Sequence, residues 1–160
     1  SGHAELGICN FTGEPVGELQ AHYLGSVALA PVCAASHPLA RSSEHTPTAL
    51  LERYIQVVHT ERDATGSADQ GVIAPRTWRV TDLGAKTNLI RRGVGWGSLP
   101  LDLVAPDIAA STLVRLHPQV WSPDGHQLPM HAITRNGATP GRALAWLCKH
   151  LGAEDTRLRT

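Results

Sequence analysis

The segment GVGWGSLP, from Gly93 to Pro100, places three glycines at alternate positions, and such glycines can bring backbone N–H groups close to a phosphate. A phosphate loop needs its glycines after a strand and at the start of a helix, so that the N–H groups and the helix dipole point at the anion. Here a predicted helix ends at Gly93, and Gly95 and Gly97 lie inside the next predicted strand. We therefore predict that these glycines serve close packing and bind no nucleotide.

Histidines could supply metal ligands, because the chain contains nine of them. Metalloenzyme helices commonly place two histidines four residues apart, so that both face one metal ion. No two histidines of this chain have that separation; they are His3, His22, His37, His45, His59, His117, His126, His131 and His150. We expect neither a metal site nor a cofactor.

Three cysteines, Cys9, Cys33 and Cys148, are far apart in the sequence and form no CxxC pair. Cys9 and Cys33 lie in apolar, strand-like runs and Cys148 lies on the apolar face of a predicted helix, which favours inert thiols in a reducing compartment. A cysteine nucleophile with a distant histidine base stays open, because catalytic partners need not be adjacent in sequence. One alternative is therefore a small α/β enzyme.

Helices and strands must hold any catalytic or binding residues in place. Along this chain, apolar strand-like runs alternate with helical patterns. This alternation predicts an α/β fold with a mostly parallel sheet. The predicted strands span residues 6–9, 26–34, 54–59, 78–80, 94–99, 113–116 and 129–135. The predicted helices begin at Thr46-Pro47, Thr81-Asp82, Pro100 and Thr139-Pro140, and Gly93 ends the second of them.

Composition sets the broad class of the protein. The 160 residues are 42% hydrophobic, which suits one domain with a sizeable core. Fourteen Lys and Arg residues balance fourteen Asp and Glu residues without long runs of one sign, which argues against strong nucleic-acid binding by this chain itself. Because no signal-peptide pattern and no apolar run of about twenty residues occurs, we expect a cytoplasmic protein without a membrane span.

Short polar side chains follow two of the predicted strands. Thr60-Glu61-Arg62-Asp63 comes directly after the strand at 54–59, and Asn10 and Thr12 follow the first strand. Open α/β sheets bind ligands at the carboxyl ends of their strands, and hydroxyl and amide groups there suit small polar ligands. The alternative is an ordinary solvated loop, which composition alone favours.

The order of several segments resembles the effector-binding domain of LysR-type transcriptional regulators. The segments are AELGI (4–8), LGSVALAPVCAASHPLA (24–40), YIQVVHT (54–60), VTDLGAKTNLIRRGVGWGSLPLDLV (80–104) and LVRLHP (113–118). That domain is similar to the type 2 periplasmic binding proteins, in which two α/β lobes are joined by two crossing strands and the effector binds between them. The resemblance covers nearly the whole chain.

This resemblance implies a periplasmic-binding-protein-like (type 2), Rossmann-like α/β fold. It implies a partial first lobe at residues 4–23, a complete second lobe at 24–135, and a C-terminal segment at 136–160 that returns to the first lobe. Members of the family contact DNA through an N-terminal winged helix-turn-helix, which the matched segments do not include. DNA would therefore be a partner only through that further domain.

The resemblance also implies an effector site. Thr60 matches the hydroxyl residue that ends the first strand of the second lobe, where members of the family often contact the effector. Asn10 and Thr12 follow the first-lobe strand that lines the opposite wall. The remaining candidates, which are neighbours of Thr60 by topology, are His59, Glu61 and Trp96.

We therefore expect a sensor without enzymatic activity, which binds a small polar metabolite and modulates transcription. The helix at 82–92 matches a surface that the family uses for antiparallel dimers, which implies a homo-oligomer. The alternative in another class is a fragment of a periplasmic solute-binding protein of a transporter, because these proteins share the two-lobe architecture.

Overall fold

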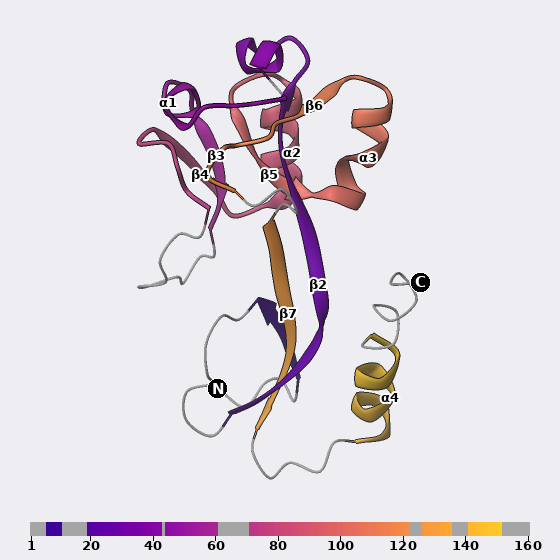
Figure 1. Cartoon of the computed structure of the whole chain (residues 1–160). Coiled ribbons are helices and arrows are strands. Elements are labelled where there is room, and N and C mark those ends of the chain that lie inside the picture. Colours follow the sequence, from indigo (N-terminus) through magenta and orange to yellow (C-terminus); the bar gives the residue numbers. More distant parts are fainter. Residues whose placement is uncertain are drawn as a thin grey trace. The chain divides into compact units, whose positions relative to one another are not determined.

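The computed structural model describes residues 6–10, 19–42, 44–60, 71–121, 126–135 and 141–151. The chain divides into two compact units (Figure 1). Unit 1 comprises Ser1–Val27 and Gln127–Thr160, and unit 2 comprises Ala28–His126. Strand β2 (Leu19–Ala34) begins in unit 1 and ends in unit 2. It starts seven residues before the predicted strand, because its first half pairs within unit 1 and carries no simple apolar pattern.

The sheet of unit 2 is mixed. Strand β2 pairs antiparallel with β5 (Trp96–Pro100) and with β6 (Leu113–Arg115). Strand β3 (Gln56–His59) pairs parallel with β5 and with β4 (Thr77–Val80). Among the strands that the structure describes, only β4, β3 and β5 pair in parallel. The expectation of a mostly parallel sheet is therefore corrected: β3 runs parallel to β5, but β2 runs antiparallel to it.

Helix α2 (Leu83–Arg91) begins and ends as its sequence predicts. The Asp82 side chain accepts a hydrogen bond from the Ala85 N–H at 2.6 Å, which caps the first turn. Gly93 follows the helix with φ of 74°, a left-handed conformation that favours glycine. Helix α3 (Leu101–Ala109) likewise starts directly after Pro100, as predicted.

The short helix α1 (Thr48–Leu51) starts one residue later than predicted, because Pro47 and not Thr46 occupies the cap position. The Thr46 hydroxyl donates to the Ser42 carbonyl at 2.9 Å. The Thr46 backbone also forms a parallel bridge with Pro118. Thr46 is therefore held by a distant segment and is unavailable as a cap.

Two apolar clusters cover the two faces of the unit 2 sheet. Helices α2 and α3 contribute to the first cluster, which contains Ala30, Val32, Val57, Ile90, Leu99, Val104 and Leu113. Helix α1 and the 3-10 helix η1 (Pro38–Ser42) contribute to the second, which contains Cys33, Leu39, Leu51, Ala74, Trp96 and Leu116. The alternation of side chains along β5 places Trp96 on the face opposite to its glycine neighbours, as expected.

Two glycines allow β5 to approach its neighbours closely. A Cβ atom at Gly95 would collide with the backbone carbonyl of Ile55. A Cβ atom at Gly97 would lie 2.5 Å from the Val57 carbonyl oxygen and 3.1 Å from the Ile90 side chain on α2. The predicted packing role is confirmed, since real side chains do not tolerate such contacts.

Unit 1 contains an antiparallel pair of strands. Strand β1 (Gly7–Asn10) pairs with β7 (His126–Arg135), with Gly7 opposite Ile133 and Asn10 opposite Met130. Strand β7 starts three residues before its predicted start, in a stretch that was not predicted to be a strand. Helix α4 spans Arg142–Leu151. No helix in the described part of the chain is long and apolar enough to cross a membrane.

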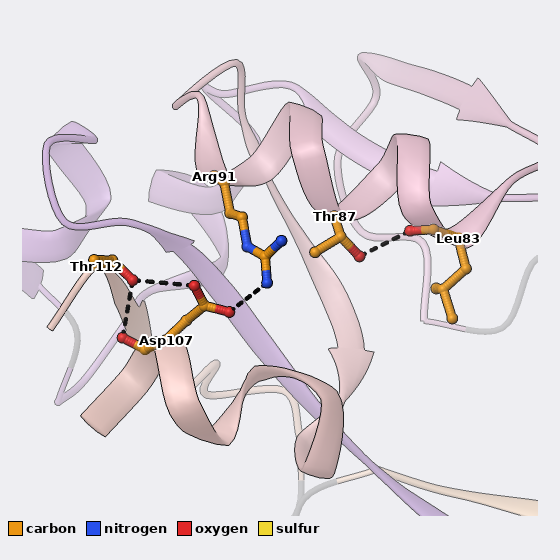
Figure 2. A network of polar contacts seen from close by, with 5 residues as sticks. All are labelled: Leu83, Thr87, Arg91, Asp107 and Thr112. Carbon is orange, nitrogen blue, oxygen red and sulfur yellow. Dashed lines mark hydrogen bonds and ion pairs between the residues drawn. The ribbon is translucent and has the colours of Figure 1, made fainter. Parts of the chain in front are cut away.

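An ion pair joins α2 to the end of α3 (Figure 2). The Arg91 guanidinium donates to the Asp107 carboxylate at 2.7 Å, and the Thr112 hydroxyl donates to the other carboxylate oxygen at 3.2 Å. The hydrogen bond from Arg91 lowers the pKa of Asp107. Figure 2 also shows the Thr87 hydroxyl bonded to the Leu83 carbonyl within α2, at 2.8 Å.

Gly95→Ala is expected to destabilise the protein by about 1–3 kcal/mol, because the new methyl group must displace the Ile55 backbone. Gly95 directly precedes β5. Gly7→Ala is the control, since Gly7 begins β1 and no described atom stands within 4 Å of the position of its Cβ. Its change should stay within about 0.5 kcal/mol. Urea denaturation followed by circular dichroism measures both. Equal effects of the two substitutions would contradict the close approach at β5.

Asp107→Asn is expected to cost about 0.5–1 kcal/mol at neutral pH, because it removes a partly exposed ion pair. The folded pKa of Asp107 is lowered, so the pair stabilises the protein above the unfolded pKa of about 4 and this contribution is lost as the pH falls through the folded value. A double-mutant cycle with Arg91→Gln, measured by urea denaturation from pH 7 to pH 3, should show a coupling that disappears in acid. A coupling that does not change with pH would refute this account.

Candidate functional site

Thr60 lies at the carboxyl edge of the parallel strands of unit 2. Its backbone N–H donates to the Val80 carbonyl at 2.9 Å, which ties the end of β3 to the end of β4. Thr60 is half-buried, and His59, the last residue of β3, is exposed opposite Val80. Two of the predicted site residues therefore stand together at a strand end, where ligands of open α/β sheets bind.

The first turn of α2 starts at the same edge. Asp82, its cap residue, comes two residues after Val80, and the Lys86 N–H donates to the Asp82 carbonyl at 3.0 Å. The Asp82 carboxylate already accepts a hydrogen bond from the Ala85 N–H. The edge therefore presents the exposed side chains of Thr81 and Asp82 beside Thr60.

Trp96 belongs to the core of unit 2 and not to its surface. Its relative exposure is 0%, and its indole N–H donates to the Leu51 carbonyl at 3.2 Å. The only polar atom of the side chain is thus already bonded inside the protein. Trp96 supports the second apolar cluster, and a direct contact with an effector is not favoured.

The other predicted site residues fall elsewhere. Asn10 ends β1 in unit 1 and is exposed. Thr12 and Glu61 lie outside the described residues. These three therefore remain predictions that rest on the resemblance.

Gln56 and Lys86 are among the buried polar residues that the sequence analysis did not single out. The Gln56 side chain accepts from the Ile73 and Ala74 N–H groups at 2.8 and 3.0 Å, and donates to the Gly71 carbonyl at 2.7 Å. It holds the chain at 71–74 against the start of β3. Lys86 is buried in α2. The sequence could have indicated this burial, because Lys86 lies four residues before the apolar Ile90 and residues at that spacing share one face of a helix.

His37, which lies between β2 and the 3-10 helix η1, has a structural role. The His37 Nδ1 accepts from the Leu39 N–H at 3.2 Å, and its ring packs edge-on against Tyr54 with centroids 4.9 Å apart. Burial lowers the pKa of His37, which favours the neutral ring. Among the described residues, no group of three His, Cys, Asp or Glu side chains could hold a metal ion.

The cysteines differ in their surroundings. Cys33 is fully buried, and burial raises its pKa to about 11, so the predicted inert thiol is confirmed there. Cys9 is half-buried and stands opposite His131 across the β1–β7 pair. The His131 ring lies 5.5 Å from the Tyr23 ring. The Cys148 side chain lies outside the described residues.

Comparison with known proteins assigns the family. The family model described as the LysR substrate binding domain matches residues 1–155. The chain belongs to this family. The match favours a regulatory domain over the solute-binding protein of a transporter. None of the curated proteins matches the chain significantly.

Solved structures of LysR-family regulators have the same fold. The regulatory domain of MetR from N. meningitidis is 19% identical, with a TM-score of 0.73 over 98% of this chain and 74% of that one. The CcmR regulatory domain of Synechocystis PCC6803 is 16% identical, with a TM-score of 0.73 over 98% and 76%. Full-length LysG from Corynebacterium glutamicum is 19% identical, with a TM-score of 0.62 over 98% and 52%. The fold is therefore the periplasmic-binding-protein-like (type 2) α/β fold of LysR regulatory domains.

In the native protein, iodoacetamide is expected to label Cys9 well before Cys33. At pH 8 only about one in a thousand Cys33 thiols is ionised, and the side chain is also shielded from the reagent. Peptide mass spectrometry over a time course measures the two rates, and the same reaction in urea is the control in which they should become similar. Labelling of Cys33 at the rate of Cys9 under native conditions would contradict its burial.

Proposed function

We propose that the chain is the effector-sensing domain of a LysR-type bacterial transcriptional regulator. It binds a small polar metabolite and thereby modulates DNA-dependent transcription. The observation that carries this proposal is the family match over residues 1–155. The regulator acts in the cytoplasm, contacts DNA through its helix-turn-helix domain, and performs no enzymatic reaction.

Several structural relatives support the binding of small molecules by this fold. The CcmR regulatory domain was solved in complex with 2-PG, the effector-binding domain of QuiR with shikimate, and full-length LysG with its effector Arg. These ligands belong to those proteins, and their diversity is consistent with a shared fold whose site residues set the specificity.

In this chain the effector contacts the edge formed by the ends of β3 and β4. The Thr60 N–H is already bonded to Val80, so the Thr60 hydroxyl is the group that remains for a ligand. His59 lies next to it and is exposed. By resemblance to the family, the proposed site also includes Asn10, Thr12 and Glu61.

Regulation follows from unequal affinity of the effector for two arrangements of the protein. A ligand that binds one arrangement more tightly shifts the population toward it, and no other driving force is needed. Helix α2, which starts at the effector edge, carries the surface that the family uses for dimers. The effector would thus change how the DNA-binding domains of a homo-oligomer meet the promoter.

Thr60→Val is expected to weaken effector binding by about 3- to 10-fold, because it deletes one hydrogen-bonding hydroxyl while it keeps the shape of the side chain. The effector is first found with a thermal-shift screen of metabolites, since a ligand that binds only the folded state raises apparent stability. Isothermal titration then measures affinity, and a promoter reporter measures the response of the whole regulator.

Thr60→Ser is the matched control, because it retains the hydroxyl group. Urea denaturation should show that both variants keep the stability of the wild type within about 0.5 kcal/mol. An unchanged response of the valine variant would remove Thr60 from the site.

A further inference from the structure

Cys9 and His131 stand directly opposite each other in unit 1. They are paired in the antiparallel ladder of β1 and β7, one step along from the pair of Asn10 and Met130. Side chains at paired positions point to the same face of a sheet, and their Cβ atoms lie about 4.5–5.5 Å apart. The Cys9 thiol and the His131 imidazole therefore share one face of the sheet and lie within reach of each other.

Tyr23 approaches the His131 ring from the other side of β7. Strand β7 lies between β1 and β2 in the sheet, and Figure 1 shows β7 alongside the first half of β2. The rings of Tyr23 and His131 meet edge-on, with centroids 5.5 Å apart. Such a contact favours one orientation of the imidazole. Three side chains from three strands, Cys9, His131 and Tyr23, thus gather on one face, with His131 in the middle.

The charges on these strands favour a thiolate at Cys9. None of the three strands contains Asp or Glu, whose negative charge would oppose ionisation of the thiol. Side chains alternate between the faces, so Arg135 lies on the face of His131, at the exposed end of β7. The exposed His22 lies on the face opposite to Tyr23. An imidazole beside a thiol accepts its proton and then stabilises the thiolate as a cation. Among the side chains of these strands, His131 is therefore the base placed to activate Cys9.

Cys33 provides a contrast within the same chain. Its ladder partners are Trp96 on β5 and Val114 on β6, and neither side chain can accept a proton. Cys33 is fully buried and burial raises its pKa to about 11, whereas Cys9 is only half-buried. Both cysteines lie in strands, so their partners and their exposure decide which thiol can react.

We propose that Cys9 and His131 form a thiol–imidazole pair in which Cys9 is a site of reversible modification by small disulfides, the chemical class of glutathione disulfide. The Cys9 thiolate attacks one sulfur of the disulfide. A new S–S bond forms to Cys9 while the S–S bond of the reagent breaks, and the departing thiolate takes up the proton that His131 accepted from the thiol. Cys9 is oxidised and the reagent is reduced, so no further oxidant is needed.

The test follows the reaction of the native protein with dithiodipyridine, a small disulfide that releases a coloured product, as a function of pH. Peptide mass spectrometry assigns the cysteine that reacts. The same protein in urea gives the profile of a thiol without a folded environment. His131→Gln removes the base, and His22→Gln is the matched control, because His22 is an exposed histidine of the same unit on the other face of the sheet.

If the proposal holds, His131→Gln slows the reaction of Cys9 by about 3- to 10-fold at about pH 6.5, because a thiol without a basic partner ionises near pH 8.5. The difference disappears by about pH 9.5, where the thiol ionises without help. The native wild type reaches its half-maximal rate at least about one pH unit below the protein in urea. His22→Gln reacts like the wild type at every pH. Glutathione disulfide adds glutathione to Cys9 and leaves Cys33 unmodified, and dithiothreitol removes the adduct.

Equal rates for the wild type and His131→Gln in mild acid overturn the proposal, and so does an equal loss in His22→Gln. The wild-type profile is sufficient even if His131→Gln fails to fold. Half-maximal reaction of native Cys9 at the same pH as in urea leaves no role for His131. The outcome is independent of the proposed function, because neither Cys9 nor His131 belongs to the proposed effector site.

Discussion

The close approach of β5 to β3 and to α2 is the contact on which the rest of unit 2 depends. Gly95 leaves room for the backbone of Ile55, and Gly97 leaves room for the Val57 carbonyl oxygen and the Ile90 side chain. Side chains at the two glycines would force the parallel strands apart and lift the helix from the sheet. The ends of β3 and β4 meet at one polar edge because β4 pairs in parallel with β3, which in turn lies against β5.

Helix α2 joins that edge to the rest of the unit. Asp82 caps it next to the strand ends, Lys86 is buried against β5, and Arg91 binds Asp107 on α3. A ligand at the edge would therefore act on a rigid element that is fixed at both ends. In the proposed function this is how a small molecule biases the helix that the family uses for dimer contacts, since a population shift needs only a difference in affinity between two positions of such an element.

The features predicted correctly from sequence depend on neighbouring residues. The start of α2 at Asp82 and its end at Gly93 follow from one side-chain hydrogen bond and one left-handed glycine, both within a turn of the helix. The early start of β2 at Leu19 and the mixed pairing of the sheet were missed, because strand direction and partner are set by distant segments. Thr46 is a further case in which a distant segment overrides the local pattern. Threonine is a common helix cap, but the bridge between Thr46 and Pro118 holds Thr46 away from the cap position of α1.

By itself, the sequence determined three things. The order of its segments indicated the family, and its residue types predicted the packing role of Gly97 and the place of Thr60 at a strand end. Only the tertiary structure decided that Trp96 is a core residue bonded to Leu51, and that Lys86 is buried over Gly97. The first group follows from local periodicity and backbone conformation, which the residue types encode directly. The second follows from burial and from contacts between elements far apart in the chain, and these exist only once the sheet and its helices have packed together.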